Sequence, residues 1–386
     1  MARLRVMQLI TELAPAGAER CVYELARRLD RSRFDVSVAG LRGGAMAGLL
    51  REAGVPVHVL GVRGRWDLPK LVSLVRLLRA DRVDILHTHL FHADLAGRVA
   101  AYLAGVPHVV HTVHTAEARF RPWQFAFARL WAELGGPAAP GRQTAGIIAV
   151  SESVRDHHAA RSGLPAGCYA VIPNGVDVDA FARDEEARAA NRRAWGVGDG
   201  EFLLAFVGRL DREKGVDTLL AAMVLLDSRG LAPRLAMAGD GPERPMVEGF
   251  LAGAAGRGTR RLGFVDDVRG VLSAADALVM PSRWEGFGMA AAEAMAAGLP
   301  VIAANVPGLR DVVADGLTGL MVPPEEPEAL AACIERLTGD AKLCRELGRS
   351  GRNRVAELFH IDVTVAAHAE LYQSIAGVRL TAPDEP

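Results

Sequence analysis

Residues 281–298 read Pro-Ser-Arg-Trp-Glu-Gly-Phe-Gly-Met-Ala-Ala-Ala-Glu-Ala-Met-Ala-Ala-Gly. They follow a short apolar run, Ala277–Met280, whose length suits a buried parallel strand. A polar turn comes next, and then a run of Ala, Met and Glu, which are good helix formers, ends at Gly298. This order predicts a strand, a loop and a helix. The loop follows the carboxyl end of the strand, where open α/β sheets bind ligands.

The predicted loop and helix carry two carboxylates, Glu285 and Glu293, with seven residues between them. The plain alternative is that Glu285 caps a helix and Glu293 lies on a solvated face. Ala and Met surround Glu293, however, so a solvated face is the less natural interpretation. Glycines let a ligand approach the backbone closely, and amides at a helix N-terminus attract anions. The residues expected to contact a ligand in this way are Gly286, Phe287, Gly288 and Met289.

The composition is that of a globular protein with two domains. A chain of 386 residues is too long for one ordinary core, and half of its residues are hydrophobic. The net charge of −1 gives no electrostatic case for nucleic-acid binding. Four cysteines without metal-ligand spacing are typical of free thiols in a reducing cytosol; they are Cys21, Cys168, Cys333 and Cys344.

No targeting or membrane-spanning segment is predicted. The N-terminal apolar run is too short and wrongly flanked for a signal peptide. No apolar stretch approaches the roughly 20 residues that a membrane span needs. We therefore expect a cytoplasmic protein that is at most peripheral on a membrane.

Both halves of the chain alternate short apolar runs with helical patterns. In the first half, strands are predicted at 4–10, 34–41, 55–60, 83–87, 108–113 and 145–150, and helices at 18–29, 68–79, 93–103 and 121–134. In the second half, strands are predicted at 202–207, 234–238, 261–264, 277–280 and 300–303. Such alternation predicts an α/β protein with two Rossmann-like domains, parallel sheets and a ligand cleft between them.

The boundary between the domains is expected just after Pro173-Asn174-Gly175, because Pro and Asn-Gly break regular elements. The predicted domains are therefore 1–175 and 176–360. The pattern after Gly339 predicts continuous helix as far as Ile375.

Two cations follow the first strand of the second domain. Arg209 and Lys214 lie five residues apart in a loop that enters a predicted helix at 216–227. Cations beside a helix N-terminus suit a diphosphate. Taken alone, a pair of solvated loop charges would be the better interpretation of this spacing.

These motifs together resemble a known family. The pattern Glu-Gly-Phe-Gly-x-x-x-x-Glu-Ala-Met-Ala-x-Gly of 285–298 resembles the signature of the retaining glycosyltransferases of family 4, which have the GT-B fold. Residues 208–215 resemble the family's Gly-Arg-Leu-x-x-x-Lys-Gly. The resemblance implies that 1–175 binds the acceptor and that 176–360 binds a nucleotide-sugar donor. It also implies that a last helix, at about 361–376, packs back on the first domain.

The resemblance assigns roles in the second domain. Arg209 and Lys214 would hold the donor phosphates and assist catalysis, Glu285 would bind the sugar hydroxyls, and Glu293 would bind the ribose. A turn similar to the family's Gly-x-Gly-Pro contains Gly239 and Gly241, which shape the loop. The family reads the base near Phe264 and Val265 through backbone groups, so uracil and guanine both stay open.

In the first domain, the loop before the first helix resembles the family's Gly-Gly-x-Glu. Ala16 replaces the first Gly, so Gly17 is the residue expected over the donor diphosphate. Glu19 is equally well explained as an acid favoured in the first turn of a helix. The segment 111–115 resembles the family position at which a His contacts the transferred sugar. Our choice is His114, with His111 second.

The histidines invite a metal interpretation, which we do not favour. His87 and His89 are expected on opposite faces at a strand end, and there is no Cys or acidic partner at metal spacing. Asp177-Val178-Asp179 follows the linker break and is interpreted as a turn and helix start. We expect no metal and no cofactor, because cations and helix dipoles can neutralise the diphosphate.

The segment 119–134 differs from the other predicted helices because it combines aromatic residues with arginines. A basic, aromatic amphipathic helix can lie in a membrane interface. The alternatives are packing within the protein and lining the acceptor cleft. The choice between these interpretations stays open.

The resemblance implies transfer of a sugar with retention from a UDP- or GDP-sugar to the hydroxyl of a saccharide, lipid-linked or small-molecule acceptor. Similar chains serve bacterial cell-surface polysaccharide or glycolipid assembly. Two alternatives remain: a nucleotide-sugar 2-epimerase on the same fold, and a non-catalytic subunit that binds nucleotide-sugar. The expected assembly is a monomer or a homodimer.

Overall fold

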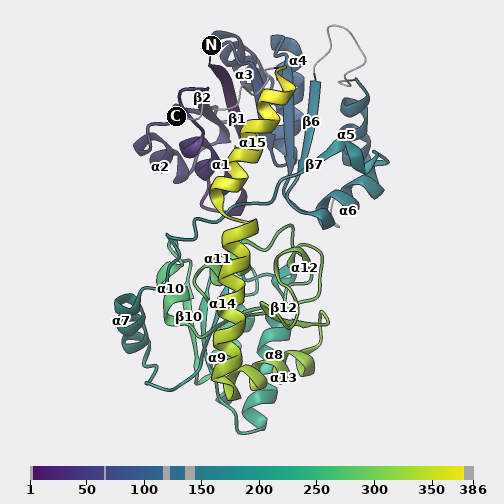
Figure 1. Cartoon of the computed structure of the whole chain (residues 1–386). Helices are drawn as coiled ribbons and strands as arrows, with labels where there is room; N and C mark the ends of the chain where they lie inside the picture. Colours follow the sequence, from purple (N-terminus) through teal and green to yellow (C-terminus); the bar gives the residue numbers. More distant parts are fainter. Residues whose placement is uncertain (1–2, 65–66, 116–121, 135–143, 378–386) are drawn as a thin grey trace, which may run out of the picture. The chain divides into compact units, whose positions relative to one another are not determined.

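The computed structural model describes residues 3–64, 67–115, 122–134 and 144–377. The chain forms two compact units. Unit 1 comprises residues 1–175 and 361–386, and unit 2 comprises residues 176–360. Figure 1 shows the order of the elements along the chain.

Unit 1 is built on a parallel sheet of seven strands in the order β3-β2-β1-β4-β5-β6-β7. The strands are β1 (Leu4–Glu12), β2 (Phe34–Arg42), β3 (Val57–Val59), β4 (Ile85–His89), β5 (His108–Val113), β6 (Thr144–Ala149) and β7 (Tyr169–Val171). The strand order reverses between β1 and β4. This reversal is the point at which α/β sheets leave a crevice for a ligand.

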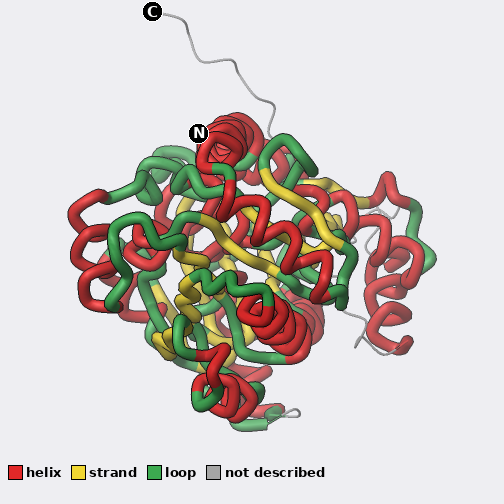
Figure 2. Tube along the Cα trace, turned by 90° about the horizontal axis from the view of Figure 1, so that it is seen from below, coloured by secondary structure: helices red, strands yellow, loops and turns green. Residues whose placement is uncertain are grey.

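Helices bury both faces of this sheet, as its apolar parallel strands require. One apolar core joins the sheet to α1 (Gly17–Arg28), α2 (Met46–Glu52) and α15 (Ile361–Ile375). The other joins it to α3 (Leu68–Ala80) and α4 (Phe91–Ala104). The remaining helices of unit 1 are α5 (Pro122–Leu134) and α6 (Glu152–Ser162). Figure 2 shows strands (yellow) with helices (red) outside them.

Unit 2 has a parallel sheet of six strands in the order β10-β9-β8-β11-β12-β13, with the reversal between β8 and β11. The strands are β8 (Leu203–Val207), β9 (Arg234–Ala238), β10 (Thr259–Gly263), β11 (Ala277–Met280), β12 (Val301–Ala304) and β13 (Gly319–Val322). The helices are α7 (Glu185–Trp195), α8 (Val216–Ser228), α9 (Arg244–Leu251), α10 (Arg269–Ala274), α11 (Met289–Ala296), α12 (Leu309–Val312), α13 (Pro327–Gly339) and α14 (Ala341–Leu358).

The predicted fold class is confirmed, because both sheets are parallel and alternate with helices. The prediction of continuous helix to Ile375 is wrong, since the chain leaves the helical conformation at Phe359 and His360. Phe359 is buried against the ring of Phe287, and its carbonyl accepts a hydrogen bond from Val176 N. These contacts occur at the break between α14 and α15.

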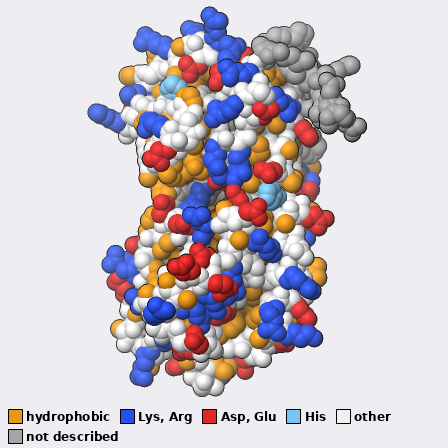
Figure 3. All heavy atoms as spheres, turned by 60° about the vertical axis from the view of Figure 1, so that its left-hand side comes forward, with side chains coloured by type: hydrophobic (Ala, Val, Ile, Leu, Met, Phe, Trp, Pro, Cys, Tyr) orange, Lys and Arg blue, Asp and Glu red, His pale blue; other side chains and the backbone are white. Residues whose placement is uncertain are grey.

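Charged side chains of both signs are interspersed over the face of unit 2 in the lower half of Figure 3. This mixture agrees with the net charge of −1. Among the helices in the described part of the chain, none is both long and apolar enough to cross a bilayer.

Candidate functional site

The strand-order reversal in unit 2 brings a cation and a carboxylate together. Lys214 follows β8 and Glu285 follows β11, which is the neighbouring strand across the reversal. The Lys214 ammonium lies 2.5 Å from Glu285 Oε1, and Ser282 Oγ donates to the same oxygen at 3.0 Å. The two side chains are only 25 % and 11 % exposed. Two residues that are 71 positions apart in sequence thus form one polar centre.

The loop before Lys214 has a shape that its sequence specifies. The carboxylate of Asp211 accepts a hydrogen bond from Lys214 N at 3.1 Å, which caps the short 3₁₀ helix Arg212–Lys214. Gly215 then adopts a left-handed conformation with φ +65°, and a Cβ atom there would lie 2.0 Å from Pro281 O. Only glycine fits this contact, so Gly215 is part of the packing between the loops after β8 and β11.

Arg209 lies in the same loop but is more exposed, at 61 %. Its guanidinium forms ion pairs with Asp211 and Glu213. Asp211 and Glu213 are only 9 % and 17 % exposed, so Arg209 is held at its carboxylate side while its own guanidinium faces solvent.

Arg283 was not among the residues predicted from the sequence, yet this side chain holds the loop geometry. Its guanidinium makes a two-pronged ion pair with Asp217 of α8, at 2.9 and 2.7 Å, and also binds Glu325 at 2.7 Å. These carboxylates raise the pKa of Arg283 above its ordinary value. Arg283 N also donates to Glu213 O at 2.8 Å. Arg283 therefore ties the loop after β11 to the loop after β8.

The predicted glycine turn lies beside the same loop. A Cβ atom on Gly239 would lie 1.8 Å from Gly208 O, and one on Gly241 would lie 2.4 Å from Leu210 O. Both glycines are therefore required for loop packing. Phe264 and Val265 follow β10, and the Phe264 ring is exposed at 60 %.

The helix N-terminus predicted from the sequence is present. Gly288 is the N-cap of α11, with φ +85°, and Met289 is the first helical residue. The Phe287 ring is buried and packs edge-on against Phe359, so this side chain belongs to the core and only its backbone is suited to a ligand. Gly286 and Glu293 are also buried.

The remaining predicted residues, His114 and Gly17, belong to unit 1. His114 follows β5 and begins a buried chain of hydrogen bonds. Its Nε2 lies 2.9 Å from His89 Nδ1, and His89 Nε2 lies 2.7 Å from Gln8 Oε1. Gln8 Nε2 donates to the Tyr372 hydroxyl at 2.9 Å.

The chain continues from α15 back into the sheet. The Tyr372 hydroxyl lies 2.6 Å from His87 Nδ1, and His87 Nε2 lies 2.7 Å from Thr112 Oγ1. Burial lowers the pKa of His87 and His89 well below the ordinary value, and burial with nearby His111 and His368 lowers that of His114 to about 3. All three imidazoles are therefore neutral at physiological pH.

The neutral state determines where each proton lies. Gln8 uses its amide NH₂ on Tyr372, so its oxygen accepts and His89 must donate from Nε2. His89 Nδ1 is then an acceptor, and His114 must donate to it from Nε2. The Nδ1 atom of His114 is left as a hydrogen-bond acceptor. Gln8, His89 and Tyr372 thus set the tautomer of His114, a role that no local sequence motif signals.

His111, the second choice, is engaged differently. Its Nδ1 lies 3.3 Å from Asp94 Oδ1, and Asp94 also pairs with Arg98 at 2.7 Å inside the core. The expectation that His87 and His89 face opposite ways is wrong. Residues two apart on a strand share a face, and these two rings lie with centroids 4.1 Å apart.

The loop around Gly17 begins α1. Gly17 is the first helical residue and is exposed, and Glu19 is buried in the first turn. Burial is the main cause that raises the pKa of Glu19 to about 7, from an ordinary value of 4.5. The acid is therefore held in a site that disfavours its charged form.

We expect Glu19 to make stability depend on pH. Between pH 4.5 and about 7 the folded state binds more protons than the unfolded state, so the free energy of unfolding falls as pH rises. Glu19→Gln should flatten this slope and should be about 1–3 kcal/mol more stable than the parent above pH 7. Urea denaturation at pH 5, 6, 7 and 8 measures the difference. The exposed Glu52→Gln is the control, and parallel curves for parent and Glu19→Gln would contradict the assignment.

The aromatic segment forms α5 from Pro122 onward; residues 119–121 and the side chain of Trp131 lie outside the described residues. The Phe125 ring is buried under the Arg161 guanidinium, and Trp123 packs edge-on against Phe91. Packing within unit 1 therefore uses part of the aromatic face. Trp123 and Leu130 are still about half exposed.

Within the described residues, no group of three His, Cys, Asp or Glu side chains is arranged to hold a metal ion.

Two family models match the chain, one in each unit. The model described as Glycosyltransferase Family 4 matches residues 15–180, and the model described as Glycosyl transferases group 1 matches residues 187–354.

Curated relatives and solved structures agree with these matches. The 2-deoxystreptamine glucosyltransferase of Streptomyces kanamyceticus is 32 % identical over 83 % of this chain and 84 % of its own length. The UDP-Gal:alpha-D-GlcNAc-diphosphoundecaprenol alpha-1,3-galactosyltransferase of Escherichia coli is 26 % identical over 96 % of each chain. The crystal structure of Anabaena HepE in complex with UDP-glucose superposes with a TM-score of 0.84 and 23 % identity, over 96 % of this chain and 100 % of HepE.

Proposed function

The chain belongs to glycosyltransferase family 4 and has the GT-B fold, and we propose that it transfers a sugar from a nucleotide-sugar to an acceptor hydroxyl with retention at the anomeric carbon. The donor is a UDP- or GDP-sugar. The acceptor is expected to serve bacterial cell-surface polysaccharide or glycolipid assembly. The E. coli relative is named for a diphosphoundecaprenol acceptor, which supports a lipid-linked acceptor for this chain.

The observation that carries the proposal is the contact between Lys214 and Glu285 at the strand-order reversal of unit 2. A lysine beside a helix N-terminus is suited to a diphosphate, and an adjacent carboxylate is suited to sugar hydroxyls. In the structure the two groups neutralise one another. A bound donor would give each group its own partner, with the phosphates against Lys214 and the sugar against Glu285.

The remaining unit 2 residues fit the same donor. The exposed guanidinium of Arg209 would bind the phosphates in place of its present carboxylate partners. The amides of Gly288 and Met289 at the start of α11 are also suited to an anion. Glu293 would bind the ribose, and the backbone around Phe264 and Val265 would bind the base. Gly239 and Gly241 keep the adjoining loops close together.

The proposed reaction breaks the bond between the anomeric carbon and the β-phosphate oxygen, and its electron pair leaves with the nucleoside diphosphate. Arg209 and Lys214 stabilise the charge that develops on this leaving group. The acceptor oxygen attacks the same face of the sugar, and its proton passes to the departing phosphate oxygen. No nucleophile from the protein and no metal ion is required for these steps.

His114 would act on the sugar through Nδ1. Because His89 fixes the Nε2 proton, Nδ1 accepts a hydrogen bond from a sugar hydroxyl, such as the hydroxymethyl group. A neutral imidazole also tolerates the positive charge that develops on the sugar ring, whereas an imidazolium would repel it. The lowered pKa of His114 keeps it in the neutral form.

Ligand-induced stabilisation tests the donor assignment. We expect UDP or GDP, and the corresponding sugar nucleotides, to raise the melting temperature in the absence of metal, since a ligand that binds only the folded state stabilises it. ADP and its sugar derivatives provide the comparison. Product analysis with the responding donor then separates transfer from 2-epimerisation. If no nucleotide raises the melting temperature with or without Mg²⁺, the assignment is wrong.

A further inference from the structure

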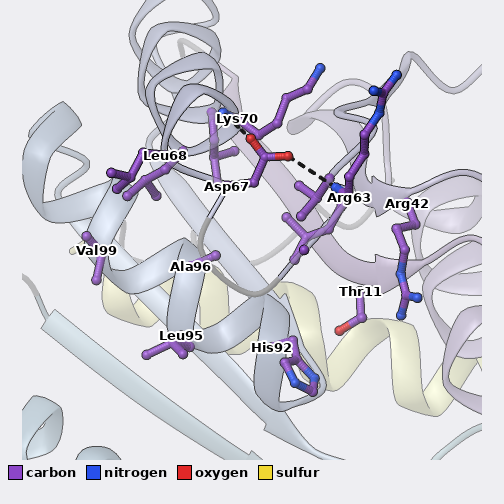
Figure 4. A pocket seen from close by; sticks show the side chains of 15 residues that line it. Thr11, Arg42, Arg63, Asp67, Leu68, Lys70, His92, Leu95, Ala96 and Val99 are labelled. Carbon is purple, nitrogen blue, oxygen red and sulfur yellow. Dashed lines mark hydrogen bonds between the residues drawn. The ribbon is translucent and has the colours of Figure 1, made fainter.

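A cavity of about 380 Å³ lies within unit 1. It is large enough for a small molecule, since such sites range from about 300 to 1,000 Å³. The carboxyl ends of β1 and β2 form one side, at Thr11 and Arg42, and the start of α4 forms another, at His92. Because α4 follows β4, the cavity lies at the reversal between β1 and β4. Figure 4 shows the side chains that line it.

Most of the cavity wall is apolar. Side chains of α3 and α4 face one another across it, as Figure 4 shows for Leu68, Leu95 and Val99. Leu68 is 65 % exposed at the start of α3. Covering these side chains with an apolar group would remove their surface from water and favour binding.

One end of the cavity is polar. Thr11, Arg42 and His92 lie together there, and the guanidinium of Arg42 extends toward Thr11 (Figure 4). The hydroxyl oxygen of Thr11 is buried and has no hydrogen-bond partner among the described residues. A buried hydroxyl without a partner costs free energy, which a ligand oxygen can recover. The polar end is therefore incomplete without a ligand.

The charges around the cavity favour an anion. Three cations line it, Arg42, Arg63 and Lys70, against one carboxylate, Asp67. The head group of Arg42 extends toward Thr11, whereas those of Arg63 and Lys70 extend away from it at the other end (Figure 4). The oxygens of Asp67 already accept from the backbone amides of Arg63 and Lys70, at 3.1 and 3.4 Å, as a cap on α3. Among the described residues, the side chains of Arg63 and Lys70 form no ion pair.

Arg42 is available as well. It pairs with Glu12 at 3.3 Å, but the two side chains are 56 % and 42 % exposed. Exposed pairs are weak, so Arg42 can exchange this partner for a ligand anion.

We propose that this cavity binds the acceptor and selects an anionic amphiphile, a molecule whose apolar chain or ring carries a phosphate or a carboxylate. The apolar part lies between α3 and α4, and the anionic part lies at Thr11, Arg42 and His92. A neutral, fully hydroxylated acceptor would leave the leucine walls without a matching partner. The assignment to the acceptor rests on the proposed function, whereas the chemistry of the cavity does not.

Calorimetry with n-octyl phosphate tests whether the cavity binds an anionic amphiphile. Inorganic phosphate and n-octanol are measured separately, because they represent the anionic half and the apolar half of that molecule. We expect n-octyl phosphate to bind at least tenfold more tightly than either half. Arg42→Gln, which removes the cation, and Ala96→Phe, which fills the cavity from α4, should each weaken this binding about tenfold. The exposed Arg76→Gln on α3 should leave it unchanged.

UDP binding is measured on the same variants. Arg42→Gln and Ala96→Phe should bind UDP like the parent, which separates the cavity from the donor site in unit 2, and a circular-dichroism melting curve like that of the parent shows that unit 1 is folded. If n-octyl phosphate binds no more tightly than its halves, or binds both variants as tightly as the parent, the inference is overturned. If the parent binds n-octyl phosphate but no nucleotide, the proposed function fails while the cavity chemistry stands.

Discussion

Lys214→Ala is expected to lower kcat/KM for the donor by about 10²- to 10³-fold, which is the usual effect of removing one preorganised group that stabilises developing charge. Two causes contribute. The leaving diphosphate loses a cation, and Glu285, which is 11 % exposed, loses its ion-pair partner at 2.5 Å. Steady-state kinetics with the donor identified by thermal stabilisation measures the change.

Lys342→Ala is the matched control for this variant, because Lys342 lies in the same unit and is 79 % exposed. It should leave kcat/KM within twofold of the parent. Arg209→Ala should resemble Lys214→Ala in direction. Equal kinetics for Lys214→Ala and Lys342→Ala would remove the phosphate-binding assignment.

Gly215→Ala is expected to destabilise unit 2 by about 3–5 kcal/mol, a range that substitutions creating backbone strain together with a steric conflict can reach. Both occur here. The left-handed φ of +65° disfavours any residue with a Cβ atom, and that atom would lie 2.0 Å from Pro281 O. The loops after β8 and β11 would have to separate, which also removes the contact between Lys214 and Glu285.

Gly230→Ala separates the cost of the left-handed backbone conformation from the cost of the steric conflict. Gly230 has a similar φ of +74°, but a Cβ atom there meets nothing within 4 Å. It should cost only about 1 kcal/mol, the penalty for the backbone conformation alone. Urea denaturation of both variants measures the difference. Similar losses for Gly215→Ala and Gly230→Ala would mean that the contact with Pro281 contributes nothing.

The loops that carry the candidate donor residues could be located from the sequence because the information that specifies them is local. Each motif follows one strand directly, so a strand-loop-helix pattern placed Lys214, Gly239, Glu285 and Gly288 near strand ends, and the resemblance to the family supplied their expected roles. The glycines are specified by backbone geometry and the capping residues by hydrogen bonds within a few positions, as for Asp211 and Lys214. Interactions between residues so close along the chain can be recognised from the sequence.

Other features depend on residues that are distant in sequence. The tautomer of His114 is set through His89 and Gln8 by Tyr372, which lies 364 positions after Gln8. No periodicity links these residues, since their contact arises only when α15 packs on the first sheet.

The sequence by itself thus determined two parallel α/β sheets, the loops that carry the phosphate- and sugar-binding candidates, and the family. The tertiary structure alone decided that Lys214 meets Glu285, that Arg283 joins their loops, and that an apolar cavity with a cationic end lies beside Thr11. The physical reason is that strand and loop conformation depend on neighbours along the chain. Pairing of side chains across a strand-order reversal depends instead on which strands become adjacent, and only the folded sheet specifies that.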